Sequence, residues 1–328
     1  MFFYKELIKI IYSNLLDDFL AYLKTTKGAS ETTLREYYYD IRTFLRFILL
    51  RKGFVENEEF NEINIDNIDI EVLKGVNKQD IYAYNAFLEN RRNNSNKTKY
   101  RKISAIRTFF NYLSTKIDVI DFNPVENIDM PKIEKTIPVY LTLEESIHLL
   151  KTVHNSKSKY KHRDFAIITL FLNCGMRLSE LSSLSVDDIK DDNTLVVKGK
   201  GNKERVIYLN EACIQALNKH FEYRTDVEDK ALFLSMRNTR MSNRAIQRMV
   251  EKYIKMSGLD PTKYTVHKLR HTAATLMYQY GNADIRALQE ILGHESVTTT
   301  QIYTHINNKH LKQTVESNPL SDINEDTF

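Results

Sequence analysis

The spacing of apolar residues is the feature that most limits the folds open to this chain. Over roughly the first 125 residues, apolar side chains recur every three or four positions, which is typical of amphipathic helices. The stripes are Leu15, Phe19 and Leu23; Tyr38, Ile41, Phe44, Leu45 and Ile48; Ile81, Tyr84 and Leu88; and Ile103, Ile106, Phe109, Phe110 and Leu113. The sequence therefore predicts a purely helical first domain over residues 1–122.

A segment punctuated by prolines ends this helical pattern. Three prolines fall within residues 123–140, and each of them disfavours helical geometry in the residue before it. We interpret this segment as a linker. The second domain, residues 141–317, opens where Thr142 and Glu145 have the spacing of a helix-capping box. Residues 318–328 are predicted to form a flexible tail.

Beyond the linker, the sequence predicts further helices and one short hairpin. The helices are expected at 162–174, from 178, at 210–222, 241–256, 266–280 and 283–292, with a last pair near 297–304 and 307–316. Two β-type runs, 195–197 and 206–209, flank a glycine-rich turn, as in a hairpin. The predicted fold class is therefore mainly α, with one small β-sheet in the second domain.

Composition excludes several classes of protein. With 9 Gly, 5 Pro and 27% charged residues, the chain is globular rather than fibrous or disordered. No stretch approaches the roughly 18 apolar residues of a membrane span, and the amphipathic N-terminus lacks a signal-peptide cleavage site, so we expect a cytoplasmic protein. The two cysteines, Cys174 and Cys213, fit neither a disulfide framework nor a zinc pattern.

Charge is distributed unevenly along the first domain. The net charge of +4 is too small to identify a nucleic-acid partner by itself. However, residues 56–71 carry only acidic charges, whereas residues 91–107 carry only basic ones. The basic side chains are Arg91, Arg92, Lys97, Lys99, Arg101, Lys102 and Arg107. Such a run is either a solvated helix face or a surface that binds phosphate, and both interpretations stay open.

Several segments of the second domain carry groups suited to a phosphodiester. Arg177 precedes Glu180 by three residues, which fits either a braced guanidinium or an ordinary surface ion pair. Lys200 lies in the predicted hairpin turn, flanked by Lys198 and Lys203. There it is either a cation presented to an anion or a solvated hairpin tip.

Three further candidates follow along the chain. His267 and Arg270 stand three residues apart, so both project from one face of a helix. His294 follows the glycine at which a helix is predicted to end. Tyr303 offers an oxygen nucleophile, although a tyrosine is more often a core or interface residue.

Considered together, these groups match one reaction. Two arginines can grip the non-bridging oxygens of a single phosphate, while a lysine and histidines transfer protons and a tyrosine attacks. No cluster of carboxylates accompanies them to hold Mg²⁺. The sequence therefore predicts no metal and no other cofactor, with the arginines supplying the electrostatic stabilisation.

The order Arg177, Lys200, His267-x-x-Arg270, His294 and Tyr303 resembles that of the tyrosine recombinase (phage integrase) family. The segments GMRLSEL, KGKGNKERVIYL, HKLRHTAAT and LGHESVTTTQIYTH are similar to its Xer branch. SETTLREYYYDIRTFLRF and the basic helix resemble the helical, SAM-like core-binding domain of Xer proteins. The resemblance covers almost the whole chain and implies the tyrosine recombinase fold.

The resemblance also implies a role for each group. Tyr303 would attack the scissile phosphate, forming a 3′-phosphotyrosyl link and releasing a 5′-hydroxyl. Arg177 and Arg270 would clamp the phosphate, with Glu180 as the bracing acid. Because the phosphotyrosine conserves the bond energy, neither ATP nor a metal would be needed.

Lysine and histidine roles follow from the same resemblance. Lys200 would protonate the leaving 5′-oxygen, His267 would assist proton transfer near the nucleophile, and His294 would hydrogen-bond the phosphate. The basic run, together with Lys198 and Lys203, would contact the DNA backbone.

The family implies duplex DNA as the partner and a Holliday junction as an intermediate. Four protomers would act on two sites, as a homotetramer or as a heterotetramer with a paralogue, and an FtsK-type translocase is a further candidate partner. The biological task stays open between chromosome dimer resolution, inversion and mobilisation of an element. Two other classes are a type IB topoisomerase and a non-catalytic DNA-binding protein of the same fold. The Xer-like sequence segments, and the expected residue type at each catalytic position, favour the recombinase.

Overall fold

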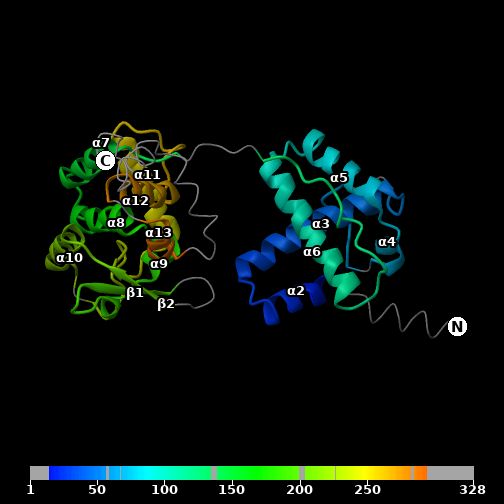
Figure 1. Ribbon diagram of the computed structural model, residues 1–328, viewed down its shortest axis with the longest axis horizontal. Coiled ribbons are helices and arrows are strands. Elements are labelled where there is room, and N and C mark those ends of the chain that lie inside the picture. The colour runs from blue at the N-terminus through cyan, green and yellow to red at the C-terminus, as the bar shows by residue number, and fades with distance from the viewer. Residues whose placement is uncertain are drawn as a thin grey trace, which may run out of the picture. The chain divides into compact units, whose positions relative to one another are not determined.

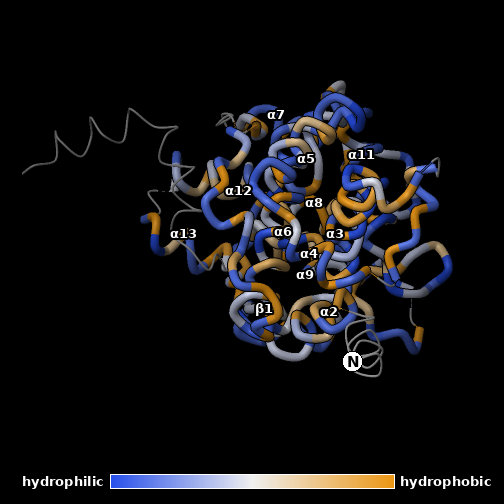
Figure 2. The backbone as a smooth tube through the Cα atoms, turned by 90° about the vertical axis from the view of Figure 1, so that its right-hand side faces the viewer, coloured by the Kyte–Doolittle hydropathy of each residue, from blue (hydrophilic) through white to orange (hydrophobic). Residues whose placement is uncertain are grey.

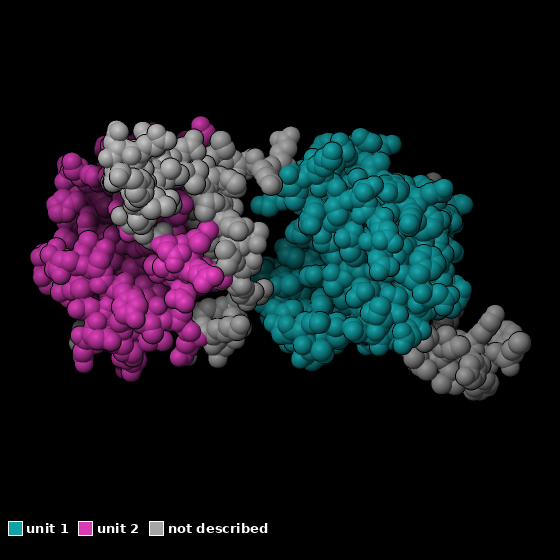
Figure 3. Space-filling view, in the orientation of Figure 1, with its two compact units in different colours: residues 1–135 teal, residues 136–328 magenta. Residues whose placement is uncertain are grey.

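The computed structural model describes residues 15–56, 59–66, 68–133, 139–198, 204–225, 227–281 and 284–293, with the backbone alone at residue 198. The chain divides into two compact units, residues 1–135 and 136–328 (Figures 1 and 3). The predicted fold class is confirmed, because the described residues are mostly helical and contain one two-stranded sheet.

Unit 1 is a helical bundle. Its described helices are α2 (Leu15–Thr25), α3 (Glu31–Arg51), α4 (Ile70–Lys74), α5 (Lys78–Asn90) and α6 (Asn96–Thr115). Ser30, Asn77 and Ser95 precede three of these helices, and each side chain accepts a hydrogen bond from a backbone N–H of the first turn. The four predicted apolar stripes lie on α2, α3, α5 and α6, whereas the short α4 was not predicted.

Aromatic side chains fill the core of unit 1. Phe19, Phe44, Tyr84 and Phe109 are essentially inaccessible to solvent. Phe19 meets Phe109 edge-on with ring centroids 5.2 Å apart, and Phe44 meets Tyr84 in the same way at 5.2 Å. The first pair joins α2 to α6 and the second joins α3 to α5. A further edge-on contact between Phe44 and Phe110, with centroids 6.0 Å apart, joins α3 to α6, so aromatic contacts hold all four helices together.

The segment predicted as a linker is shorter than residues 123–140. Val125 and Ile128 are buried in the core of unit 1, and Arg107 donates hydrogen bonds of 3.0 Å to the backbone carbonyl of each. At the other end, Leu141 is buried in unit 2, where its backbone N–H donates to Thr272 Oγ1. Prolines indicate extended backbone, but extended backbone can still pack against a domain, as it does here.

Asp80 ties the start of α5 to the end of α3. Its carboxylate lies 2.8 Å from Arg51 Nε and 3.0 Å from Lys52 Nζ, and it accepts the backbone N–H of Asn77. Burial alone would raise the pKa of Asp80, but the hydrogen bonds from Arg51 and Lys52 hold the pKa below its ordinary value. The ionised form is therefore the one that stabilises the fold.

We expect Asp80→Asn to lower the free energy of unfolding near neutral pH by on the order of 2 kcal/mol, because charge-assisted hydrogen bonds are lost. The stability from Asp80 is present above the unfolded pKa and is lost as the pH falls through the lower folded pKa. The difference between wild type and Asp80→Asn should therefore shrink below about pH 4. Urea unfolding measured from neutral to acidic pH tests this, and a difference independent of pH would contradict it.

Unit 2 contains more elements but has one central helix. They are α7 (Leu143–His154), α8 (Lys161–Cys174), α9 (Leu178–Ser183), the 3₁₀ turn η1 (Val186–Asp188), β1 (Thr194–Lys198), β2 (Glu204–Tyr208), α10 (Glu211–Tyr223), α11 (Asn243–Met256), α12 (Val266–Tyr280) and α13 (Ile285–Leu292). The predicted hairpin is confirmed, with β1 antiparallel to β2 and Lys198 opposite Glu204. The last helix pair predicted lies outside the described residues.

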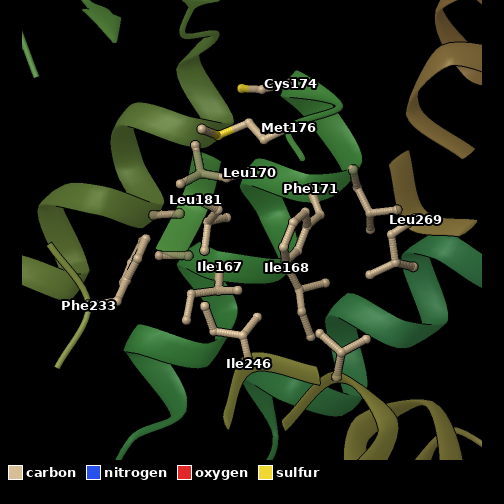
Figure 4. Close-up of a cluster of buried hydrophobic side chains, with 14 of the residues drawn as sticks. Ile167, Ile168, Leu170, Phe171, Cys174, Met176, Leu181, Phe233, Ile246 and Leu269 are labelled. Atoms are coloured by element: carbon tan, nitrogen blue, oxygen red, sulfur yellow. The ribbon is translucent and has the colours of Figure 1, made fainter. Parts of the chain in front are cut away.

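Helix α8 is apolar on nearly every side and forms the centre of unit 2. Figure 4 shows Ile167, Ile168 and Phe171 from α8 surrounded by side chains of other elements, including Phe233 and Leu269. The burial of α8 between α7, α10 and α12 fixes the position of its C-terminal end, where the first candidate site residue follows. Beside this end, Cys174 and Cys213 are free, buried thiols with sulfur atoms 3.7 Å apart.

Hydrophobic and hydrophilic residues are interleaved along the helices rather than gathered in long apolar runs (Figure 2). Accordingly, none of the helices in the described part of the chain is long and apolar enough to cross a membrane.

Candidate active site around Glu180

The turn between α8 and α9 places Arg177. Gly175 ends α8 in the left-handed conformation with φ of +58°, and Arg177 is the residue that caps α9. The Arg177 backbone N–H donates to Glu180 Oε2 at 2.7 Å, and its Nη1 donates to Oε1 at 2.8 Å. The predicted contact between the two side chains therefore exists. It is not an ordinary surface pair, because the Glu180 side chain is only 1% exposed.

Glu180 is the centre of a cluster of three arginines. Arg205 from β2 approaches both carboxylate oxygens, with Nη1–Oε1 and Nη2–Oε2 distances of 3.0 Å. Arg270 from α12 lies with Nη1 4.0 Å from Oε2. One negative charge thus faces three positive charges, which leaves an excess of positive charge for an anionic ligand.

The same arginines hold the C-terminal end of α13. Arg177 Nη2 donates to the Gly293 carbonyl at 2.6 Å, and Arg270 Nη2 donates to the Leu292 carbonyl at 2.6 Å. Arg270 Nη1 also donates to the Gly175 carbonyl at 2.7 Å. The last carbonyls of a helix lack partners within the helix, and guanidinium groups satisfy them well. The arginine cluster is therefore fixed directly before position 294.

His267 shares an open pocket with these arginines. The pocket has a volume of about 720 Å³, and its lining includes Arg177, His267 and Arg270 together with Arg244 and Gln247 from α11. The imidazole of His267 lies in the first turn of α12, edge-on to that of His271 at 4.6 Å. Four of the predicted site residues thus belong to one site with a solvent-accessible face: Arg177, His267 and Arg270, which line the pocket, and Glu180, which holds Arg177.

The remaining predicted site residues cannot be compared with the structure. Lys200, Lys203, His294 and Tyr303 lie outside the described residues, and only the backbone of Lys198 is described, at the end of β1. Their roles stay predictions.

Arg205 was not singled out from the sequence, although a signal was present. Along β2, Val206 and Tyr208 are exposed while Ile207 is buried, so the strand alternation directs Arg205 inward. Its side chain is 14% exposed. Burial holds the pKa of Arg205 below its ordinary value, although the facing Glu180 carboxylate acts in the opposite direction. A charged residue on the buried face of a strand needs a partner, and here that partner is Glu180.

The basic run of unit 1 is not one exposed surface. Lys99 is buried at 4% exposure and its Nζ lies 2.6 Å from Glu89. Arg101 and Lys102 both pair with the buried carboxylate of Asp40, the latter at 3.0 Å. Together with Arg107, which holds backbone carbonyls, these side chains contribute to the fold of unit 1. The prediction for Lys99 is therefore corrected: Lys99 is buried and does not belong to an exposed phosphate-binding face, whereas contact of Arg101, Lys102 and Arg107 with DNA stays a prediction.

Four members of the run are exposed: Arg91, Arg92, Lys97 and Arg101, whose side chain is 46% exposed. Arg91, Arg92 and Lys97 lie at the end of α5 and the start of α6, and the Arg92 guanidinium stacks 5.0 Å from the ring of Phe60. Contact with DNA stays a prediction for these four side chains.

Two protein-family models match the chain, one in each unit. The model of the phage integrase family matches residues 140–310, and that of the phage integrase N-terminal SAM-like domain matches residues 16–116. The helical unit, the mainly helical second unit and the arginine cluster around a buried acid agree with this match. The chain belongs to the phage integrase family.

Individual similar proteins show which kind of phage integrase family member this chain resembles. The chain is 48% identical over 314 residues to a tyrosine recombinase XerC of Caldanaerobacter subterraneus subsp. tengcongensis, covering 94% of this chain and 88% of the relative. It is 35% identical over 317 residues to a tyrosine recombinase XerC of Thermodesulfovibrio yellowstonii, covering 93% and 96%. The fold is similar to that of the XerH site-specific recombinase in a post-cleavage complex with a palindromic difH substrate. That match has a TM-score of 0.69 at 24% identity, covering 93% of this chain and 84% of the other.

This protein is accordingly a Xer-like site-specific tyrosine recombinase. The topoisomerase and the non-catalytic DNA-binding protein are not favoured.

Proposed function

We propose that this recombinase cleaves and rejoins duplex DNA at a chromosomal Xer-type site, through a 3′-phosphotyrosyl intermediate and a Holliday junction, and thereby resolves chromosome dimers. The observation that carries the proposal is the arginine cluster, in which Glu180 holds Arg177 and faces Arg270 beside an open pocket. The similarity to two XerC proteins over more than nine-tenths of the chain supports the chromosomal role.

In the proposed reaction the two arginines bind the non-bridging oxygens of the scissile phosphate. Tyr303 Oη attacks phosphorus, the bond to the 5′-oxygen breaks, and Lys200 donates a proton to that oxygen. Arg177 and Arg270 stabilise the charge that develops on the phosphorane oxygens, with each arginine contributing on the order of 3 kcal/mol. The new phosphotyrosine ester conserves the energy of the broken bond, so a 5′-hydroxyl of the second duplex reverses the step without ATP.

The histidines complete the proposed proton transfers. His267, on the wall of the same pocket as Arg177, assists removal of the proton from the nucleophile. His294 follows directly after Gly293, whose carbonyl Arg177 holds, and it donates a hydrogen bond to a phosphate oxygen.

The proposed assembly is a tetramer on two duplex sites in the cytoplasm, made of this chain alone or of this chain and a paralogue. An FtsK-type translocase is the proposed activator. A solved XerH relative is described as bound to a palindromic difH substrate, which supports a duplex site with two half-sites.

A covalent-trapping assay tests the proposed chemistry. Nicked suicide duplexes that carry Xer-type sites of the source chromosome are incubated with the full chain in EDTA, without nucleotide, and separated on a denaturing gel. We expect a shifted protein–DNA band, and peptide mapping by mass spectrometry should place the nucleotide on the peptide that contains Tyr303. A band that requires Mg²⁺, or a nucleotide carried by another peptide, contradicts the proposed mechanism.

The exposed basic surface of unit 1 makes a separate prediction about binding. We expect Arg91→Glu with Lys97→Glu to weaken duplex affinity and to reduce the slope of log K against log salt by about 1–2, because each phosphate contact releases counterions. These positions avoid Arg101 and Lys102, whose reversal would break the ion pairs with Asp40.

Lys116 supplies the matched control for that binding measurement. It is exposed at the opposite end of α6, roughly 30 Å from Lys97 by the rise of an α-helix. A double reversal matched in charge, Lys116→Glu with Lys27→Glu, should leave the salt slope nearly unchanged. An equal loss of affinity and slope in both variants would mean that residues 91–97 are only a solvated face.

A further inference from the structure

Arg205 joins three elements of the site. It is the second residue of β2, and its guanidinium reaches Glu180 on α9 and the Leu292 carbonyl at the end of α13, the latter at 2.9 Å. In the sequence Lys200 lies between β1 and β2, and His294 directly follows Gly293. One side chain thus connects the base of the hairpin, the acid that holds Arg177, and the helix end before His294.

Arg205 and Arg177 share the carboxylate of Glu180. Each carboxylate oxygen accepts one hydrogen bond from Arg205, and the same two oxygens accept Nη1 and the backbone N–H of Arg177. A two-point contact fixes the plane of a carboxylate as well as its position. Glu180 is therefore held between Arg205 on one side and Arg177 on the other, while the Gly293 carbonyl accepts the second Nη of Arg177.

The close approach of Arg205 to α13 is built into the backbone. Gly293 adopts φ of +60°, and a Cβ at this position would lie 2.3 Å from Arg205 Nη1. Only a glycine allows both the left-handed helix end and this contact. Among the described residues no hydrogen-bond partner faces the buried Arg205 Nε, and the hydrogen bonds seen there come from its two Nη groups.

We propose that Arg205 is a positioning residue of the recombination reaction: its two-point contact with Glu180 orients Arg177 toward the scissile phosphate. It acts through Glu180 and does not touch the DNA. This inference rests on the proposed phosphate-binding role of Arg177. A lysine cannot replace it fully, because an ammonium group makes a point contact and lacks the planar fork.

The test is a double-mutant cycle on single-turnover cleavage of a saturating nicked duplex. We expect Arg205→Met to slow cleavage by about 10- to 100-fold and to leave the Kd for the duplex unchanged, because the effect lies in the transition state. The double variant with Arg177→Ala should be no slower than Arg177→Ala alone, because both act through one contact. Rate losses that multiply would overturn the proposal.

Two variants separate positioning from folding. Arg224 also donates to backbone carbonyls, those of Asp229 and Ala231, but it does not contact Glu180. Arg224→Met should therefore affect thermal unfolding while the cleavage rate of the folded protein stays at the wild-type value. Arg205→Lys retains the charge and is expected to fold, with a rate between those of wild type and Arg205→Met. A wild-type rate in Arg205→Lys would overturn the two-point contact.

The outcomes distinguish this inference from the proposed function. If wild type forms no adduct, the proposed strand transfer itself fails. If wild type forms the adduct, Arg177→Ala forms it much more slowly and Arg205→Met cleaves at the wild-type rate, only the role of Arg205 is overturned.

Discussion

Replacing Tyr303 with phenylalanine is expected to abolish the covalent protein–DNA adduct and to leave duplex affinity nearly unchanged. The substitution removes a single oxygen and keeps the ring, so packing is retained while the proposed nucleophile is lost. The chain contains 19 tyrosines, and the alternative to be excluded is that another one attacks. Gel shift for affinity and denaturing electrophoresis for the adduct give the two measurements.

Tyr208 provides the matched control for this substitution. Its side chain is 81% exposed on the outer face of β2, close in sequence to the site but turned away from Glu180. Tyr208→Phe should therefore form the adduct at the wild-type rate. An adduct in Tyr303→Phe would show that Tyr303 is not the nucleophile, whereas loss in both variants would indicate a general defect of the assay.

Most of the fold could be predicted from local sequence patterns, chiefly the spacing of apolar residues. The predicted apolar stripes of unit 1 lie on its helices, except that α4 was missed, and the described helices of unit 2 begin and end within a few residues of their predicted bounds. Apolar periodicity predicts helices well because it depends only on residues close together in the sequence. The linker was overestimated for the converse reason. Prolines report backbone conformation, but they do not report that Val125 and Ile128 find a place in the core of unit 1.

The site was predictable where its partners are neighbours in sequence. The spacing of Arg177 and Glu180 gave the pair directly, since three residues correspond to nearly one helical turn. The other contacts of Glu180 come from Arg205 and Arg270, which approach from β2 and α12. Only the tertiary fold brings these segments together, so residue spacing could not reveal a shared carboxylate.

Long-range pairing also explains why the basic run could not be judged from its sequence alone. A sequence of seven basic residues does not show which of them are neutralised from elsewhere in the domain. Asp40, which pairs with Arg101 and Lys102, lies some 60 positions earlier in the chain. The buried Asp40 holds both side chains by ion pairs, although the Arg101 side chain is still 46% exposed.

Arg270→Ala is expected to slow cleavage of a saturating nicked duplex by about 10²- to 10³-fold, because one of the two proposed phosphate donors is lost. The Arg270 side chain is only 5% exposed, and it already donates to the carbonyls of Gly175 and Leu292. A purely structural role is therefore the competing explanation. It predicts a loss of stability, with an unimpaired rate in whatever fraction stays folded.

Rates normalised to the folded fraction decide between the two explanations of Arg270. Arg270→Lys keeps the positive charge beside Glu180 but cannot bind two phosphate oxygens, so it should recover stability more than rate. Added guanidinium ion should restore part of the rate to Arg270→Ala by occupying the vacated space. As a control, Arg248→Ala removes the same charge from an exposed position on α11 and should change neither quantity. If the folded Arg270→Ala protein cleaves within tenfold of the wild-type rate, the phosphate is held without Arg270, and that residue only braces the end of α13.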